Sequence, residues 1–228
     1  MLIKVNGLSF GYEHKAILSN LSFSIERGDF VGIVGSNGAG KSSLVKVLTS
    51  QLKPFKGEII KENNLRCGYL AQHNLNYENF PASVFEVVQS GLISKLKHRF
   101  FYSRKDKEKC LKIISYLALE PLMHKCYREL SGGQQRTVLL ARSLCVADDL
   151  LILDEPNAGL DFKASEHLNK LIKKINQDLK LTIIMVTHDL NSLKNCNKVL
   201  YLDKGQNFFG SFHEYKASPF YKSLWGNV

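Results

Sequence analysis

The chain has 228 residues and a formal net charge of +10, with 44% of its residues hydrophobic and 23% charged. This length and balance suit one globular unit and exclude a disordered chain. No apolar run approaches the roughly 20 residues that a membrane-spanning helix needs, and we expect no signal segment before the first strand.

Five scattered cysteines, never spaced as C-x-x-C, indicate reduced thiols in a cytoplasmic protein rather than a disulfide framework. The basic charge favours an anionic partner and leaves three classes open, which are a nucleotide, a nucleic acid and an acidic membrane leaflet. Residues 95–102 form the densest basic and aromatic run. Such a run is more often a solvated helix end than a binding site.

Short alternating apolar segments early in the chain predict an antiparallel sheet that flanks a nucleotide pocket. These segments are residues 2–5, 17–25 and 57–60. Residues 30–34 predict a buried strand. Apolar residues then recur at helical spacing from Leu44 to Leu52, and Pro54 closes this segment.

The loop between this strand and this helix matches the phosphate-binding pattern G-x-x-x-x-G-K-[ST]. Its backbone N–H groups can surround an anion, and the helix that begins near Lys41 points its positive end at the same place. We expect Lys41 to reach the β and γ phosphates of a nucleotide and Ser42 to bind Mg²⁺. A glycine turn that only caps a helix is the plainer alternative, and the order of strand, loop and helix weighs against it. The candidate nucleotide-binding residues are Gly35, Ser36, Asn37, Gly38, Ala39, Gly40, Lys41, Ser42 and Ser43.

Residues 84–144 contain almost no strand signal and predict a helical subdomain, in which Ser103 and Asp106 form a capping box. Residues 130–134 precede an apolar helix and offer a second phosphate-sized nest of free amides. One nucleotide needs only one phosphate cradle from a single subunit. We therefore expect a head-to-tail homodimer with two ATP molecules at its interface. The residues of the second nest are Ser131, Gly132, Gly133 and Gln134.

Three continuously apolar segments predict parallel strands covered on both faces. Together with the early antiparallel strands, they predict a mixed sheet. These segments are residues 150–153, 182–186 and 199–202. A helix from Leu168 to Leu179 supplies the crossover.

Asp154 and Glu155 end the first of these strands, where α/β sheets place their ligands. We expect Asp154 to hold Mg²⁺, directly or through water, and Glu155 to polarise the attacking water as general base, although a plain strand end and turn is the alternative.

Together with Gln72, residues 158–161 and His188, these motifs resemble the ATP-binding cassette (ABC) ATPases over essentially the whole chain. The resemblance implies an α/β fold with a P-loop NTPase core, a mixed sheet, an antiparallel β subdomain and a helical signature subdomain. It implies a single nucleotide-binding domain of residues 1–228. Gln72 would sense Mg²⁺ and the membrane partner, and His188 would contact the γ-phosphate during catalysis. Taken singly, these two would be a surface amide and a strand-end histidine, and their order and spacing favour the functional roles.

The resemblance also implies that Asp161 communicates across the dimer and that Tyr12 stacks on adenine. Phe10 competes for this last role, and a core aromatic is the plain interpretation of Tyr12. The chain departs from the family pattern at Arg136, because the customary arginine of the signature helix is shifted one position earlier. Its contacts are therefore left open.

The resemblance implies a motor subunit that works with a separate integral membrane permease and an extracytoplasmic solute-binding protein, at the cytoplasmic face of the inner membrane. Residues 80–88 and 138–142 are similar to segments of zinc and manganese importer ATPases, with iron-chelate importers next nearest. ATP and Mg²⁺ are the implied cofactors. A soluble family member that acts on nucleic acid is a rival, although we expect no direct nucleic acid contact. A module that binds ATP without hydrolysing it is a second rival, which the presence of Glu155 and His188 disfavours.

Overall fold

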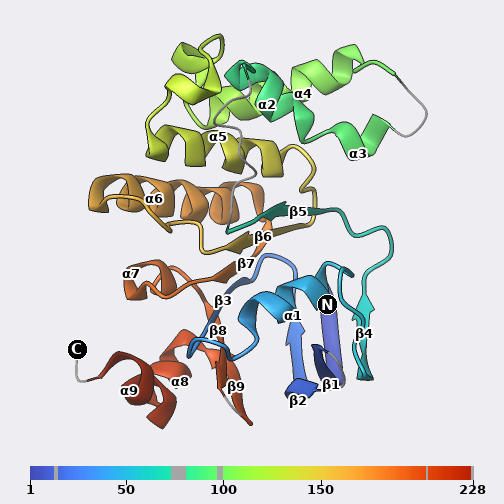
Figure 1. The fold of residues 1–228 in the computed structure, drawn as a ribbon, viewed down its shortest axis with the longest axis vertical. Helices are drawn as coiled ribbons and strands as arrows, with labels where there is room; N and C mark the ends of the chain where they lie inside the picture. Colours follow the sequence, from blue (N-terminus) through green and yellow to red (C-terminus); the bar gives the residue numbers. More distant parts are fainter. Residues whose placement is uncertain (13–14, 73–80, 97–99, 204, 227–228) are drawn as a thin grey trace.

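The structure is a computed structural model that describes residues 1–12, 15–72, 81–96, 100–203 and 205–226. A group of helices, α2 to α5, lies at the top of the view in Figure 1, and a small antiparallel sheet lies at the lower right. A larger sheet runs between them, and the last helices of the chain, α8 and α9, lie at the lower left.

Three strands form the small antiparallel sheet in the order β2–β1–β4, which confirms the sheet predicted from alternation. Their bounds are β1 (Ile3–Tyr12), β2 (Lys15–Ile25) and β4 (Lys56–Lys61). The register of β1 against β2 shifts between Val5 and Leu8, and both side chains are buried although three positions separate them. A bulge of this kind bends the strand and interrupts strict alternation.

Six strands form the larger sheet in the order β5–β6–β7–β3–β8–β9. The first five are parallel to their neighbours and β9 is antiparallel to β8, so the sheet is mixed, as predicted. The mixture comes from β9, which the sequence analysis does not predict, whereas the early antiparallel strands form a sheet of their own. The bounds are β3 (Phe30–Gly35), β5 (Cys67–Leu70), β6 (Leu150–Asp154), β7 (Thr182–Val186), β8 (Lys198–Asp203) and β9 (Gln206–Ser211).

Hydrophobic residues pack in two clusters, and β6 shows how they divide between the two faces of the larger sheet. Leu151 and Leu153 pack with residues of α5 and α6, whereas Leu150 and Ile152 pack with residues of α1 and the small sheet. Every residue of β6 is buried. Burial on both faces explains why these strands read as continuous apolar runs.

The helices cover both faces of this sheet, and α5 and α6 lie side by side above it in Figure 1. Ser103 and Asp106 form the predicted capping box at the start of α4. The first helix ends at Leu48, well before Pro54, because Ser50 adopts a left-handed φ of 63° that stops the helix. The bounds are α1 (Lys41–Leu48), α2 (Val84–Ser90), α3 (Ile93–Leu96), α4 (Arg104–Tyr116), α5 (Gly132–Leu144), α6 (Phe162–Leu179), α7 (Leu190–Leu193), α8 (Phe212–Ala217) and α9 (Pro219–Trp225).

Parts of two sequence segments that carry expectations lie outside the described residues. Lys97, His98 and Arg99 of the basic and aromatic run are among them, as is Phe80 of the segment similar to metal importers. Phe100 and Phe101, which follow that basic run, are 93% and 83% exposed. Within the described ranges, no helix is both long and apolar enough to cross a bilayer.

We predict that Leu140→Ala lowers the free energy of unfolding by about 2–5 kcal/mol, because this fully buried side chain of α5 leaves a cavity when truncated. Leu111→Ala on α4 is the matched control, since Leu111 is 44% exposed, and its loss should stay below about 1 kcal/mol. Urea unfolding of both variants measures the difference. Equal losses would contradict the packing described for α5.

Candidate active site

Residues 35–43 connect β3 to α1 at the carboxyl edge of the parallel strands. Gly38 and Gly40 have φ values of 79° and 94°, a left-handed conformation that glycine adopts without a steric penalty. A Cβ atom at Gly35 would lie 1.8 Å from the carbonyl oxygen of Leu202, so only glycine fits there. No side chain caps α1, and its first N–H groups are therefore available to an anion.

Lys41 begins α1, and its side chain is 6% exposed. Its Nζ atom donates hydrogen bonds to the carbonyl oxygens of Gly35 at 2.9 Å and Ser36 at 2.8 Å. Burial lowers the pKa of Lys41, against the opposing effect of three nearby carboxylates. A buried cation held by loop carbonyls is well placed to receive a phosphate, because charge-assisted hydrogen bonds are the stronger ones.

Asp154 ends β6 and is 4% exposed. Burial, and then the charge of Glu155, raise the pKa of Asp154, although contacts with Tyr69 and Ser42 work in the opposite direction. Its Oδ1 atom is buried and has no hydrogen-bond partner among the described groups. A buried carboxylate with an unused oxygen beside a serine hydroxyl has the donor set that a hard divalent cation takes. The structure therefore brings the predicted metal ligands Ser42 and Asp154 together.

Glu155 joins two other predicted site residues through its carboxylate. Gln72 Nε2 donates a hydrogen bond to Glu155 Oε2 at 2.8 Å, and His188 Nε2 lies 3.1 Å from Glu155 Oε1. Glu155 has a left-handed φ of 47°, a strained conformation that non-glycine residues keep where the surroundings enforce it. The three side chains follow β5, β6 and β7, so neighbouring strand ends supply them.

A cavity of about 230 Å³ lies beside this cluster of Gln72, Glu155 and His188. It opens at the carboxyl ends of β6 and β7, where ligands of parallel sheets bind. Its lining residues are Glu155, Asn157, Ala158, Thr187, His188 and Asp189.

Arg136, whose contacts the sequence left open, is 4% exposed and reaches the active site from α5. Its guanidinium group donates to the carbonyl oxygens of Pro156 at 2.6 Å, Glu155 at 2.9 Å and Ala71 at 3.2 Å. These contacts join the signature helix to the segments that carry Glu155 and Gln72. The shifted arginine is therefore a buried structural link between α5 and the candidate site.

Asp203 is a site residue that the sequence analysis missed. The hydroxyl of Ser36 in the phosphate loop donates to Asp203 Oδ1 at 2.6 Å, and Tyr201 Oη donates to Oδ2 at 3.1 Å. Asp203 ends β8, which pairs with β3 in parallel. A carboxylate at the end of a buried strand is the signal that could have found it, since Asp154 was found in this way.

The second nest lies at the start of α5 and shares no described hydrogen bond or ion pair with residues 35–43. Ser131 caps α5, with Gln134 completing the capping box. A Cβ atom at Gly133 would lie 2.9 Å from Cβ of Ala164 in α6, so α6 packs closely behind the nest. Asp161 caps α6 by accepting from the N–H of Ala164 at 2.8 Å. The second nest and Asp161 thus both lie beside Ala164 of α6, and their roles in a dimer stay predictions.

Tyr12 and Phe10, the two candidates for adenine stacking, differ in exposure. Phe10 is fully buried in the core, whereas Tyr12 is 44% exposed. The Tyr12 hydroxyl lies 3.5 Å from Ser43 Oγ and 3.4 Å from Lys46 Nζ, both on α1. Only Tyr12 presents an accessible ring beside the phosphate loop.

Comparison with models of known protein families identifies the family of this chain. The model of the ABC transporter family matches residues 18–158, which is more than half of the chain. The chain belongs to the ABC transporter family. A model of an AAA domain also matches residues 126–194, a smaller part of this ABC ATPase.

Two curated relatives are ATP-binding proteins of zinc uptake systems. The protein ZurA of Listeria innocua is 34% identical to this ABC ATPase over 225 residues, which cover 94% of this chain and 88% of the relative. The protein ZnuC of Bacillus subtilis is 34% identical over 213 residues, which cover 90% and 92%. The relatives therefore span almost the same length as this chain.

Solved structures agree with the family and with the P-loop NTPase fold. The chain of an inward-facing ABC transporter described as metal-chelate type superposes with a TM-score of 0.89 at 27% identity, covering 98% of this chain and 88% of that one. The dimeric bacterial ABC transporter cassette MJ0796 gives 0.72 at 28% identity, covering 92% and 98%. The protein is thus an ATP-binding ABC ATPase.

We predict that Lys41→Ala weakens ATP binding by about tenfold or more, because it removes the buried cation of the phosphate loop. Equilibrium binding of a fluorescent ATP analogue measures the effect. Lys53→Ala is the control, since Lys53 is an exposed lysine beyond the end of α1. Equal affinities for the Lys41→Ala variant and the wild type would contradict a phosphate site at residues 35–43.

Proposed function

We propose that this ABC ATPase is the motor subunit of a membrane importer and hydrolyses ATP as a homodimer. The observation that supports the proposal most strongly is the contact of Glu155 with Gln72 and His188, from three strand ends beside the phosphate loop. We propose that residues 1–228 form one nucleotide-binding domain, with residues 84–144 as its helical subdomain.

In this proposal the phosphate loop binds the triphosphate, and Lys41 exchanges its loop carbonyls for the β and γ phosphates. Ser42 and Asp154, with Gln72, would hold Mg²⁺, which neutralises phosphate charge when it is bound. The unused Oδ1 atom of Asp154 supports this assignment. Tyr12 would stack on the adenine ring.

Glu155 is the proposed general base. Its carboxylate would accept a proton from the water that attacks the γ-phosphorus, while the bond to the ADP oxygen breaks and phosphate leaves. His188 orients the Glu155 carboxylate from one side and would contact the γ-phosphate. Gln72 holds the other carboxylate oxygen, so the two contacts together fix the orientation of the proposed base.

The second nest, formed by Ser131, Gly132, Gly133 and Gln134, would bind the γ-phosphate of a nucleotide held by the partner subunit. One nucleotide needs only one phosphate cradle from a single subunit, so the presence of a second nest supports a head-to-tail dimer with two ATP molecules between the protomers. Asp161 lies beside this nest and would connect the two sites. The related cassette MJ0796 is dimeric, which supports a dimer here as well.

The proposed cargo is a divalent metal such as zinc or manganese, because the relatives ZurA and ZnuC are named for zinc uptake. A separate integral membrane permease would carry the cargo, with an extracytoplasmic solute-binding protein, and the ATPase would lie at the cytoplasmic face of the inner membrane. Among the described residues no group of three or more His, Cys, Asp and Glu side chains could hold a metal ion. An iron chelate is the second candidate, favoured by the structural neighbour of metal-chelate type.

We predict that Glu155→Gln slows ATP hydrolysis by about 100-fold or more while ATP binding persists, so that ATP-bound dimers accumulate. Steady-state phosphate release and size-exclusion chromatography with ATP measure the two effects. Glu166→Gln on the exposed face of α6 is the control and should hydrolyse ATP normally. Undiminished hydrolysis by Glu155→Gln would remove Glu155 from the role of base.

We predict that cells carrying only Glu155→Gln lose high-affinity uptake of radioactive zinc or manganese, because transport needs repeated hydrolysis. Cells carrying Glu166→Gln should retain it. Normal uptake of both metals in the Glu155→Gln cells would contradict the proposed cargo, and uptake of labelled iron chelate in the same strains tests the second candidate.

A further inference from the structure

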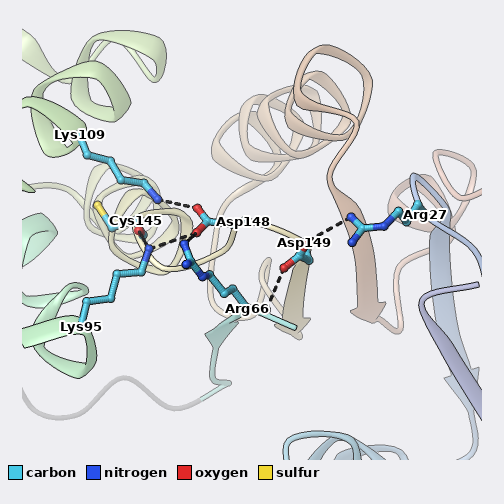
Figure 2. A network of polar contacts seen from close by, with 7 residues as sticks. All are labelled: Arg27, Arg66, Lys95, Lys109, Cys145, Asp148 and Asp149. Carbon is cyan, nitrogen blue, oxygen red and sulfur yellow. Dashed lines mark hydrogen bonds and ion pairs between the residues drawn. The ribbon is translucent and has the colours of Figure 1, made fainter. Parts of the chain in front are cut away.

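Two adjacent aspartates occupy the turn between the end of α5 and the start of β6, and their side chains point in opposite directions (Figure 2). Asp149 faces Arg27, which lies between β2 and β3. Its carboxylate accepts from Arg27 Nη1 at 3.0 Å and from the backbone N–H of Arg66 at 2.9 Å. The N–H groups of Asp149 and Leu150 return hydrogen bonds to the Arg66 carbonyl oxygen, so the start of β6 is fixed to the residue before β5.

Asp148 faces the group of helices α2 to α5. Its carboxylate accepts from Lys109 Nζ of α4 at 2.6 Å, and Lys95 Nζ of α3 lies 3.3 Å away. Arg66 Nη1 donates to the same carboxylate at 2.6 Å from the core side. Figure 2 shows the three cations converging on this single carboxylate. Asp148 is thus a shared partner of the helical region and the core.

Three cations share the Asp148 carboxylate, so the contact is a charge network rather than a single ion pair. The Asp148 side chain is 32% exposed, and it faces three cationic side chains. Burial opposes ionisation, but hydrogen bonds from Lys109 and Arg66 and the nearby lysine charges outweigh it, and the pKa of Asp148 lies well below its usual range. Loss of the negative charge would leave Arg66, Lys95 and Lys109 repelling one another across the turn.

The turn at Asp148 lies at one end of α5, and the second nest lies at the other. Near its start, α5 is fixed to the candidate site by the contacts of Arg136 with Pro156 and Glu155. The buried side chains of α5 also pack against α2, α6 and β5. Beyond the other end of this packed helix, Asp148 adds a charged contact to α3, α4 and the residue before β5.

We propose that Asp148 is a positioning residue that holds the far end of α5 against α3, α4 and the residue before β5, and thereby the place of Ser131 relative to Glu155. With a rise of 1.5 Å per residue, Ser131 lies about 7.5 Å and Leu144 about 12 Å from Arg136 along the helix. A shift of about 2 Å at Leu144 therefore moves Ser131 by about 1 Å. Misplacement of catalytic groups by about 1 Å can slow a reaction about 100-fold. The inference rests on the proposed function, because Ser131 acts on the nucleotide only in the closed dimer.

The test compares steady-state hydrolysis by the full-length Asp148→Asn variant with that of the wild type. We expect kcat to fall about tenfold, while KM for ATP changes less than about twofold, because residues 35–43 are untouched. Asp148→Glu keeps the charge and should recover most of kcat. Lys112→Met is the matched control, since Lys112 lies on α4 one turn from Lys109, and it should hydrolyse ATP normally.

A second readout separates positioning from folding. In the Glu155→Gln background, Asp148→Asn should reduce the fraction of ATP-bound dimers while binding of a fluorescent ATP analogue and the melting temperature without nucleotide stay close to those of Glu155→Gln alone. Unchanged kcat, or a loss of kcat that follows a lower melting temperature and is not relieved in Asp148→Glu, would overturn the inference. A wild-type protein that does not hydrolyse ATP would contradict the proposed function instead.

Discussion

The structure depends on one electrostatic arrangement, a buried lysine that faces carboxylates at the carboxyl edge of a parallel sheet. Lys41 is held by the carbonyl oxygens of its own loop, while Asp154, Glu155 and Asp203 lie close enough to influence its pKa. A cation and anions packed this closely are costly to bury unless each has a partner. The phosphate loop and the surrounding strand ends hold these groups in the positions that a triphosphate and a cation would use.

Adjacent strands bring the proposed catalytic side chains to this arrangement. Parallel strands end at the same edge, so Gln72, Glu155 and His188 meet although they are far apart in the chain. Arg136 then connects this edge to α5, and Asp148 connects the far end of α5 to the core. The helix that carries the second nest is therefore connected near both ends to the sheet that carries Glu155, the proposed base.

Local residue patterns predicted much of the fold. Contacts between residues far apart in the chain could not be predicted from them. The phosphate loop, the buried strands and the capping box of Ser103 are encoded by neighbouring residues, so spacing alone predicted them. Strand β5 has only four residues, and the edge strand β9 begins with exposed polar residues. Neither strand therefore has a clear apolar pattern in the sequence. Asp203 follows a predicted strand and carries the same local signal as Asp154, whereas the partners of Asp148 lie far away in the chain, where no local pattern records them.

In the proposed dimer, one triphosphate lies between the phosphate loop of one protomer and the second nest of its partner. The most direct measurement is cross-linking by a short bifunctional maleimide of protomers carrying Asn37→Cys to protomers carrying Glu129→Cys, because both positions are exposed beside the two nests. Cross-linked dimers should appear when a non-cleavable ATP analogue saturates the protein and should be scarce without it. Cross-linking that is absent, or equal with and without the nucleotide, would contradict it.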